Sequence, residues 1–427
     1  MNTTTDTPAS PTFAEAFRFW LKLGFISFGG PAGQIAIMHR EVVERRRWVD
    51  EGHFLHALNF CMLLPGPEAQ QLAIYLGWLL HRTWGGIVAG VLFVLPSALI
   101  LWALSYVYVA FGDVVWVGGV FYGLKPAVLA IVAAAVLRIG GKALKNEVMW
   151  SLAVLAFAAI FFLHAPFPLI VVAAGVIGWI GGKVRKDKFL VAKGHGSGVM
   201  PTVSGEKPTL GRALRVIATC LALWWVPLLL VGAWLGWKGT HFQQGMFFSK
   251  AAMVTFGGAY AVLPYVAQQA VETHGWLSAP QMLDGLGLAE TTPGPLIMVL
   301  QFVGFLGGWS HPGGLSPLAS ATLGAAVTTW ATFVPCFLWI FLGAPYVERL
   351  RQNERLTCAL SAITAAVVGV VLNLAVWFGL QVLFPKGADW LAVGIAVVAF
   401  VGMQRWKWGV IPVVLGAGAL GLVLKLF

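Results

Sequence analysis

Two motifs rich in glycine and proline each occur twice in the sequence. Ser27-Phe-Gly-Gly30 recurs as Thr255-Phe-Gly-Gly258, and Pro65-Gly-Pro67 recurs as Pro293-Gly-Pro295, each pair 228 positions apart. Glycine lets the backbone approach a ligand closely, and proline favours the first turn of a helix, whose free N–H groups attract anions. Helix kinks and close packing are the alternative reading. The predicted substrate-binding residues in these motifs are Ser27, Gly29, Gly30, Pro65, Gly66, Thr255, Gly257, Gly258, Pro293 and Gly294.

These motifs lie in a chain that is too apolar for a soluble protein. Of 427 residues, 59% are hydrophobic and 11% are charged, whereas soluble domains have about 25% charged residues. So few charges cannot cover a water-facing surface. The composition therefore excludes an ordinary soluble enzyme, a disordered chain and a nucleic-acid-binding domain, and it predicts a polytopic membrane protein. The net charge of +11 is then expected to lie mainly in cytoplasmic loops.

Basic residues inside apolar segments are the second group of candidate functional residues. Lys22 and Lys250 match across the 228-residue separation, and Lys125 lies in an otherwise uncharged stretch. Charge inside a membrane is costly and usually functional, so these three lysines are predicted to balance an anionic substrate. Arg18 and Arg82 are further candidates, although from segment ends they reach the interface equally well.

Two carboxylates adjoin the Pro-Gly-Pro motifs. Glu68 follows the first copy, and Glu290 precedes the second. Beside an anion site, a buried carboxylate is suited to carry a proton, so both are predicted proton-coupling residues. A structural ion pair is the equal alternative. Asp284 lies nearer a segment end and is expected at an interface.

Long apolar stretches fall into two similar halves. Lys22, Glu44 and Trp48 match Lys250, Glu272 and Trp276, which indicates an internal duplication. The predicted domains are a first repeat at 12–182, a basic cytoplasmic linker at 183–215, a connecting transmembrane helix at 216–237 and a second repeat at 244–427.

Basic residues alternate between equivalent loops. The loop 39–53 holds Arg40 and Arg45 to Arg47, but its counterpart 267–281 has neither Lys nor Arg; the bias reverses between 111–116 and 346–356. Because positive loops stay cytoplasmic, the repeats are predicted to be inverted. Placing the basic loops of the first repeat on one side requires re-entrant segments at 17–38 and 54–80. We therefore expect an all-α polytopic fold of inverted repeats with broken and spanning helices.

The ordered motifs Phe25-Ile-Ser-Phe-Gly-Gly-Pro31, Pro65-Gly-Pro-Glu-Ala-Gln-Gln71, Phe256-Gly-Gly258 and Pro293-Gly-Pro295 resemble those of the bacterial chromate transporter family in its long, two-domain form. The resemblance covers nearly the whole chain. It implies secondary export of chromate from the cytoplasm, driven by membrane potential or proton exchange, and chromate resistance. It also implies homologous domains in opposed orientation. One departure is Leu296, which stands where the first copy has Glu68.

Other functions are kept as alternatives. Uptake or exchange of sulfate or another oxyanion is the alternative within transport. An intramembrane enzyme is disfavoured because the sequence lacks HExxH, GxSxG with partners, and paired aspartates. Primary active transport by this chain alone is disfavoured because the sequence has no ATP-binding loop of the form GxxxxGK[ST]. We expect no cofactor and no metal, since His53 and His56 lack a third ligand. The expected partners are the oxyanion, the lipid bilayer of a bacterial inner membrane and a second copy in a homodimer, with no nucleic acid.

Overall fold

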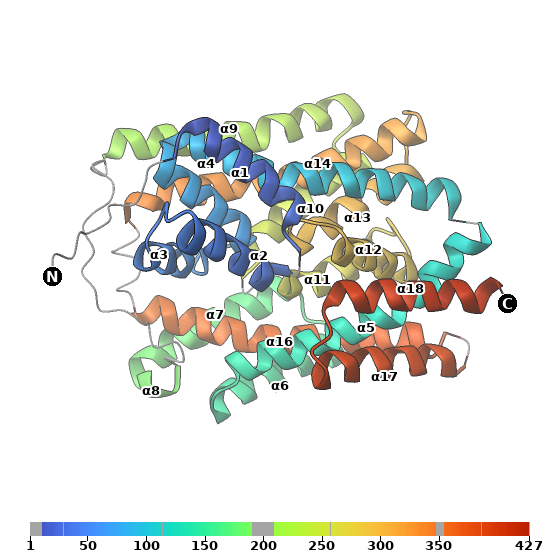
Figure 1. Ribbon diagram of the computed structural model, residues 1–427. Coiled ribbons are helices and arrows are strands. Elements are labelled where there is room, and N and C mark those ends of the chain that lie inside the picture. Colours follow the sequence, from blue (N-terminus) through green and yellow to red (C-terminus); the bar gives the residue numbers. More distant parts are fainter. Residues whose placement is uncertain are drawn as a thin grey trace.

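A computed structural model describes residues 11–28, 30–112, 114–189, 209–256, 258–346, 354–385 and 387–426. Within these ranges the chain is helical and has no strand, which confirms the predicted all-α class. Figure 1 shows long helices lying side by side along one direction. Residues 190–208 of the expected linker, and Gly29 and Gly257 of the motifs, lie outside the described residues.

The first repeat, the linker and the connecting helix comprise α1 (Phe13–Ile26), α2 (Gly30–His39), the π-helix η1 (Arg40–Arg45), α3 (Glu51–Cys61), α4 (Glu68–Phe111), α5 (Val115–Ala143), α6 (Glu147–Leu163), α7 (Phe167–Val184), α8 (Lys186–Phe189) and α9 (Leu210–Leu235). The second repeat comprises α10 (Thr240–Val254), α11 (Ala259–Ala267), the π-helix η2 (Gln268–Thr273), α12 (Ala279–Thr291), η3 (Leu296–Met298), α13 (Val299–Ser310), α14 (Pro317–Gly343), η4 (Ala344–Tyr346), α16 (Glu354–Leu383), α17 (Trp390–Arg405) and α18 (Val410–Leu426).

Matched capping residues start equivalent helices. The Asp50 side chain accepts a hydrogen bond from the backbone N–H of His53 at the start of α3. Ser278, 228 positions later, accepts one from Gln281 at the start of α12. Such caps satisfy N–H groups that the first helical turn leaves free. The π-helices η1 and η2 also begin 228 positions apart, so the duplication extends to local irregularities of the backbone.

The helix α4 is a hairpin rather than one rod. Non-helical backbone angles at His81 and Arg82 divide it into limbs 68–80 and 83–111. A Cβ on Gly77 would overlap the carbonyl oxygen of Gly85, so the two limbs touch backbone to backbone. The second repeat has the corresponding turn between α13 and α14.

Helices that are equivalent in the two repeats pack against each other in opposite directions. The indole of Trp102 donates a 3.0 Å hydrogen bond to Thr322, near the start of α14, while Gly86 adjoins Phe341 at its end. The helices α5 and α16 also run in opposite directions, because an added Cβ on Gly140 would contact Val368 and one on Gly379 would contact Leu129. Both equivalent pairs are therefore antiparallel.

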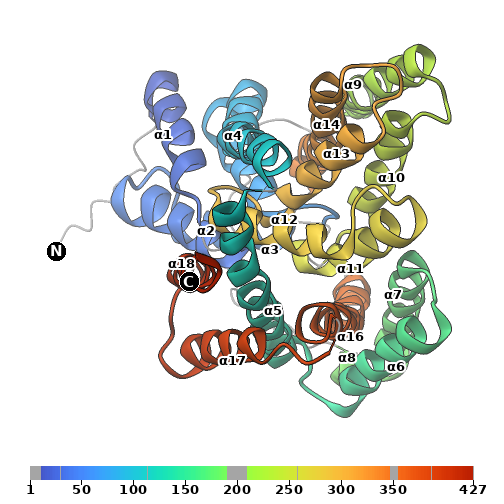
Figure 2. The ribbon, with the colours of Figure 1, turned by 90° about the vertical axis from the view of Figure 1, so that its right-hand side faces the viewer.

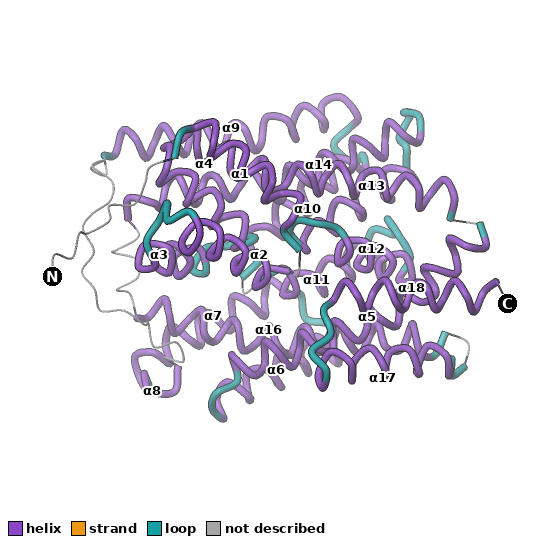
Figure 3. Tube along the Cα trace, viewed as in Figure 1, coloured by secondary structure: helices purple, strands orange, loops and turns teal. Residues whose placement is uncertain are grey.

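Broken helices occupy the middle of the molecule. Six helices in the described part of the chain are long and apolar enough to cross a membrane: α4, α5, α7, α9, α14 and α16. Figure 2 looks along many of the long helices and places α2, α11 and α12 between the α4–α14 group above and the α5–α16 group below. Figure 3 shows loop segments beside α10, α11 and α2 at the centre. The interior thus holds irregular backbone shielded by helices, as a membrane requires.

The contact between α5 and α18 gives a test of this packing. A Cβ on Gly123 would overlap the carbonyl of Ala417, so Gly123→Leu is expected to destabilise the protein by about 1–3 kcal/mol through overpacking. Gly394 has nothing within 4 Å, so Gly394→Leu is the matched control, expected within about 0.5 kcal/mol of the parent. Thermal unfolding in detergent measures both. Equal melting temperatures for the two variants would contradict the packing.

Candidate functional site

Two backbone hydrogen bonds join the repeated motifs across the repeats. The N–H of Gly66 donates to the carbonyl of Thr255 at 2.8 Å, and the N–H of Gly294 donates to the carbonyl of Ser27 at 2.7 Å. Both glycines have positive φ angles, 117° for Gly66 and 103° for Gly294, which favour glycine. The four helix breaks therefore meet at one crossing point, with each Pro-Gly-Pro segment bound to the other repeat.

The hydroxyls at the crossing point are occupied within their own helices. Ser27 donates to the carbonyl of Leu23 at 2.7 Å, and Thr255 donates to that of Ala251 at the same distance. Both side chains are fully buried. Their role at the ends of α1 and α10 is thus to satisfy free carbonyls, and donation to a ligand would require either hydroxyl to rotate.

A second matched pair packs on the glycines. A Cβ on Gly294 would lie 2.6 Å from the hydroxyl of Ser97, and one on Gly66 would lie 3.0 Å from the thiol of Cys336. Ser97 follows Pro96 and Cys336 follows Pro335, so these residues are repeat equivalents. The Ser97 oxygen is buried and has no hydrogen-bond partner, which makes it a polar group at the crossing point that the sequence analysis missed.

Buried glutamines also surround the crossing point. Gln34 donates to the carbonyl of Gly294, and Gln71 donates to that of Pro65 at 2.7 Å. Each leaves its side-chain oxygen without a partner, as does Gln70, which is 1% exposed. The signal for Gln70 and Gln71 was present in the sequence, because both belong to the motif Pro65 to Gln71.

The carboxylate of Glu68 lies at the crossing point. Glu68 is the first residue of α4, and its Oε1 lies 3.1 Å from where a Cβ of Gly258 would stand. Gly258 is the N-terminal cap of α11 and has a φ of 95°. Such close approach requires glycine. The carboxylate thus lies beside the N-terminus of a helix from the other repeat, an environment that favours an anion.

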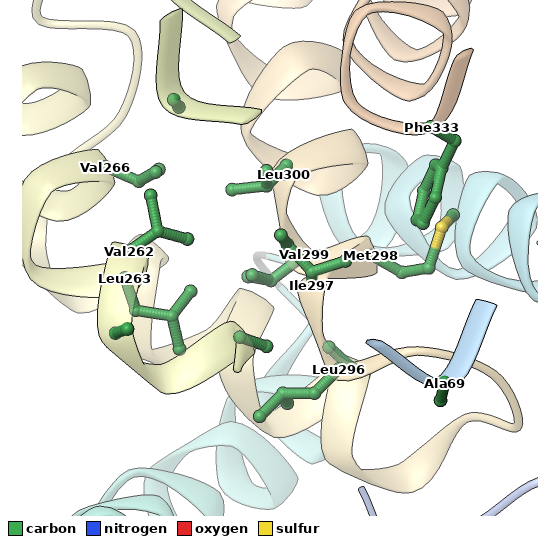
Figure 4. Close-up of a cluster of buried hydrophobic side chains, with 14 of the residues drawn as sticks. Ala69, Val262, Leu263, Val266, Leu296, Ile297, Met298, Val299, Leu300 and Phe333 are labelled. Atoms are coloured by element: carbon green, nitrogen blue, oxygen red, sulfur yellow. The ribbon is translucent and has the colours of Figure 1, made fainter. Parts of the chain in front are cut away.

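The two halves of the crossing point differ in polarity. The first repeat continues Pro65-Gly-Pro67 with Glu68, Ala69, Gln70 and Gln71, whereas the second continues with Leu296 to Val299. Figure 4 shows Leu296, Ile297, Val299 and Leu300 grouped with Val262, Leu263 and Val266 of α11 in an apolar cluster. The polar side chains therefore come from the first repeat.

The predicted basic residues lie in different surroundings. Lys22 and Lys250 have exposed side chains on α1 and α10, and no described contact joins them to the crossing point, so their charge-balancing role stays a prediction. Arg18 is exposed on α1. Arg82 is exposed at the kink of α4, with its guanidinium 5.6 Å from the ring of Trp78.

Lys125 is ion-paired rather than free. Its Nζ lies 3.5 Å from Oδ2 of Asp284, and the hydroxyl of Tyr108 donates to the same oxygen at 2.9 Å. Asp284 is 3% exposed, so it is buried among helices, and its expected position at the membrane interface stays a prediction. Lys125 of the first repeat thus pairs with a carboxylate of the second repeat. Such pairing offsets part of the cost of removing a charge from water.

Glu290 is also held by a neighbour. It is 7% exposed on α12, and Tyr260 donates a hydrogen bond to its carboxylate.

Of the prolines in the repeated motifs, Pro65 is half-buried and Pro293 is buried. In the described ranges, no three His, Cys, Asp or Glu side chains form a group that would hold a metal ion.

Comparison with known proteins gives consistent results. The family model described as "Chromate transporter" matches residues 14–179 and 242–422. The chain is 31% identical to a chromate transport protein of Pseudomonas aeruginosa over 98% of this chain and 94% of that protein. It is 31% identical to one of Cupriavidus metallidurans over 84% and 81%, respectively. A probable chromate transport protein of Synechococcus elongatus is 29% identical over 92% of this chain and 89% of the relative. No solved structure matches the chain.

A pair of alanine substitutions tests the crossing point. Gly294→Ala meets both an unfavourable φ and the Ser97 side chain, whereas Gly30→Ala meets a φ of 67° with nothing within 4 Å. We expect Gly30→Ala to cost about 1–2 kcal/mol and Gly294→Ala to cost at least about 1 kcal/mol more. Thermal unfolding of purified protein is the measurement. Ser97→Gly should recover part of the loss in Gly294→Ala, and equal destabilisation by the two alanines would count against the proposed contact.

Proposed function

The chain belongs to the chromate transporter family, and we propose that it is a secondary transporter that exports chromate from the cytoplasm and thereby confers chromate resistance. The observation that carries the proposal is the reciprocal pair of bonds from Gly66 to Thr255 and from Gly294 to Ser27. These bonds bring four helix breaks together in the interior, the arrangement in which transporters place their substrate sites.

The oxyanion is proposed to bind at the first-repeat side of the crossing point. Ser97 offers a buried hydroxyl there without a protein partner, and the N-terminus of α11, with its free backbone N–H groups, begins at Gly258. Hydroxyl and amide N–H groups donate to oxyanion oxygens, and a helix N-terminus adds a favourable dipole. The apolar cluster of Leu296 to Leu300 offers no such donors from its side chains.

We propose that the repeats lie in the membrane in opposite orientations. The antiparallel packing of α5 on α16, and of limb 83–111 on α14, supports this arrangement, because equivalent helices then run in opposite directions. The alternating positive loops support it independently. The proposed setting is a bacterial inner membrane, with the Arg45–Arg47 loop in the cytoplasm. A homodimer is proposed as the assembled form.

Electrical energy favours the outward direction. Moving one charge through 100 mV is worth about 2.3 kcal/mol, so a dianion leaving a negative cytoplasm gains roughly 4–5 kcal/mol per 100 mV. Uptake would need more than two co-transported protons to become electrically favourable. Uptake or exchange of sulfate remains the second candidate, because sulfate is also a tetrahedral dianion.

Flux measurement in proteoliposomes tests direction and selectivity together. With potential and pH gradients set separately, we expect chromate to move toward the positive side, and the rate to rise as the potential rises. Sulfate is measured in parallel as the competing substrate. Everted vesicles loaded from the cytoplasmic face give the direction. Net accumulation of either anion on the negative side at equal pH would contradict electrically driven export.

Glu68 is proposed as the proton-coupling residue because its carboxylate stands at the crossing point without a described partner. Glu68→Gln keeps the size but removes the titratable proton. We expect the variant to retain flux driven by potential and to lose the component driven by a pH gradient. Glu51→Gln, at the exposed start of α3, is the control. A pH-driven component that persists in Glu68→Gln would exclude this role.

A further inference from the structure

The helices α3 and α12, which are equivalent in the two repeats, are in different environments. On α12, every residue from Met282 to Glu290 is buried, and the helix packs on α5. On α3, Leu55 and Asn59 are exposed, and the helix packs chiefly on α4. An open cavity of about 520 Å³ lies along α2 and α3, lined in part by Ile35, Phe54 and Leu58. The helix α12 is thus enclosed by other helices, whereas its counterpart α3 has an exposed face beside an open cavity.

A cluster of polar side chains fixes α12 in its closed position. Asp284 of α12 receives the ammonium of Lys125 from α5 at 3.5 Å and the hydroxyl of Tyr108 from the end of α4 at 2.9 Å. About one helical turn later, Gly287 packs closely against α5, since an added Cβ there would lie 3.3 Å from the side chain of Val128. Breaking a buried ion pair by losing one partner leaves an uncompensated charge, so the cluster strongly favours this position.

The residues at the equivalent positions of α3 and α16 differ in type from Asp284 and Lys125. His56 stands at the position of Asp284, 228 residues earlier. Aligning α5 with α16 through Ala130-Ile131 and Ala362-Ile363 places Thr357 where α5 has Lys125. If α3 packed on α16 as α12 packs on α5, a histidine and a threonine would lie where the carboxylate and the ammonium lie now. The two arrangements therefore differ in the side chains that meet at this contact.

We propose that Asp284, Lys125 and Tyr108 form a latch that holds α12 on α5, and that transport requires the latch to open while α3 docks on α16. The inference rests on the proposed transport between opposed repeats and adds the positioning role of the latch. Inverted repeats reach their second state by exchanging the conformations of the two halves. The structure described here is then the state with the first repeat open.

The symmetry of the repeats specifies which residues meet after the exchange. Gly287 of α12 corresponds to Asn59 of α3, and Val128 of α5 corresponds to Leu360 of α16. Since Gly287 faces Val128 now, Asn59 faces Leu360 in the second state. This pair of positions is a reporter of docking that lies outside the latch itself.

Cysteine cross-linking in membranes measures the exchange. The reporter carries Asn59→Cys and Leu360→Cys after replacement of the native cysteines, which include Cys358 two positions from the reporter site. The oxidative cross-linking rate is compared with and without Asp284→Asn or Lys125→Met. We expect either latch variant to raise the rate at least threefold. The reversed pair, Lys125→Asp with Asp284→Lys, should return the rate toward that of the parent. Lys142→Met, an exposed lysine on α5, is the matched control and should leave the rate unchanged.

The outcomes separate the latch from a structural role. Unchanged cross-linking in folded Asp284→Asn and Lys125→Met variants would overturn the latch, and folding is checked by a monodisperse elution profile in detergent. No cross-link in a reporter that still transports would overturn the docking of α3 on α16. The cross-linking reporter needs no substrate, so it tests the latch separately from chromate flux. Faster cross-linking in the latch variants of a protein that shows no chromate flux would contradict the proposed function but would still support the latch.

Discussion

The whole centre of this protein depends on reciprocal backbone hydrogen bonds between the repeats. Where a helix stops inside a bilayer, its free N–H and carbonyl groups need partners within the protein, since lipid offers none. The Pro-Gly-Pro segment of each repeat finds its partner at the end of the first helix of the other repeat. Glycine at positions 66 and 294 allows both the positive φ and the close approach. The irregular backbone at the core therefore costs little, because the two copies satisfy each other.

On this symmetric framework, the chemistry is one-sided. The first repeat contributes Glu68, Gln70 and Gln71 to the centre, and the second contributes an apolar cluster. The second repeat instead supplies Asp284 and Glu290, each held by a tyrosine hydroxyl. The two copies thus share one scaffold, and they differ in placing unpartnered polar side chains in one half and carboxylates held by tyrosines in the other.

Much of this architecture could be predicted from the sequence. The apolar stretches, the constant separation of 228 residues and the breaks at Gly30 and Pro65 indicated helices that the structure contains. Composition and spacing carry this information because the membrane imposes helix length and penalises unpaired backbone. The approach of Glu68 to Gly258, and the pairing of Lys125 with Asp284, could not be predicted. Both are contacts between residues more than 150 positions apart, which depend on how the repeats pack and not on local sequence.

The reciprocal bonds also bear on how each half depends on the other. Both copies contain features such as the π-helices that begin at Arg40 and Gln268, whereas Asp284 and Glu68 distinguish the copies. Since the hydrogen bonds of Gly66 and Gly294 run between the repeats, either repeat alone would leave these interior backbone groups without their partners. The two halves therefore complete each other, and neither can form this centre by itself.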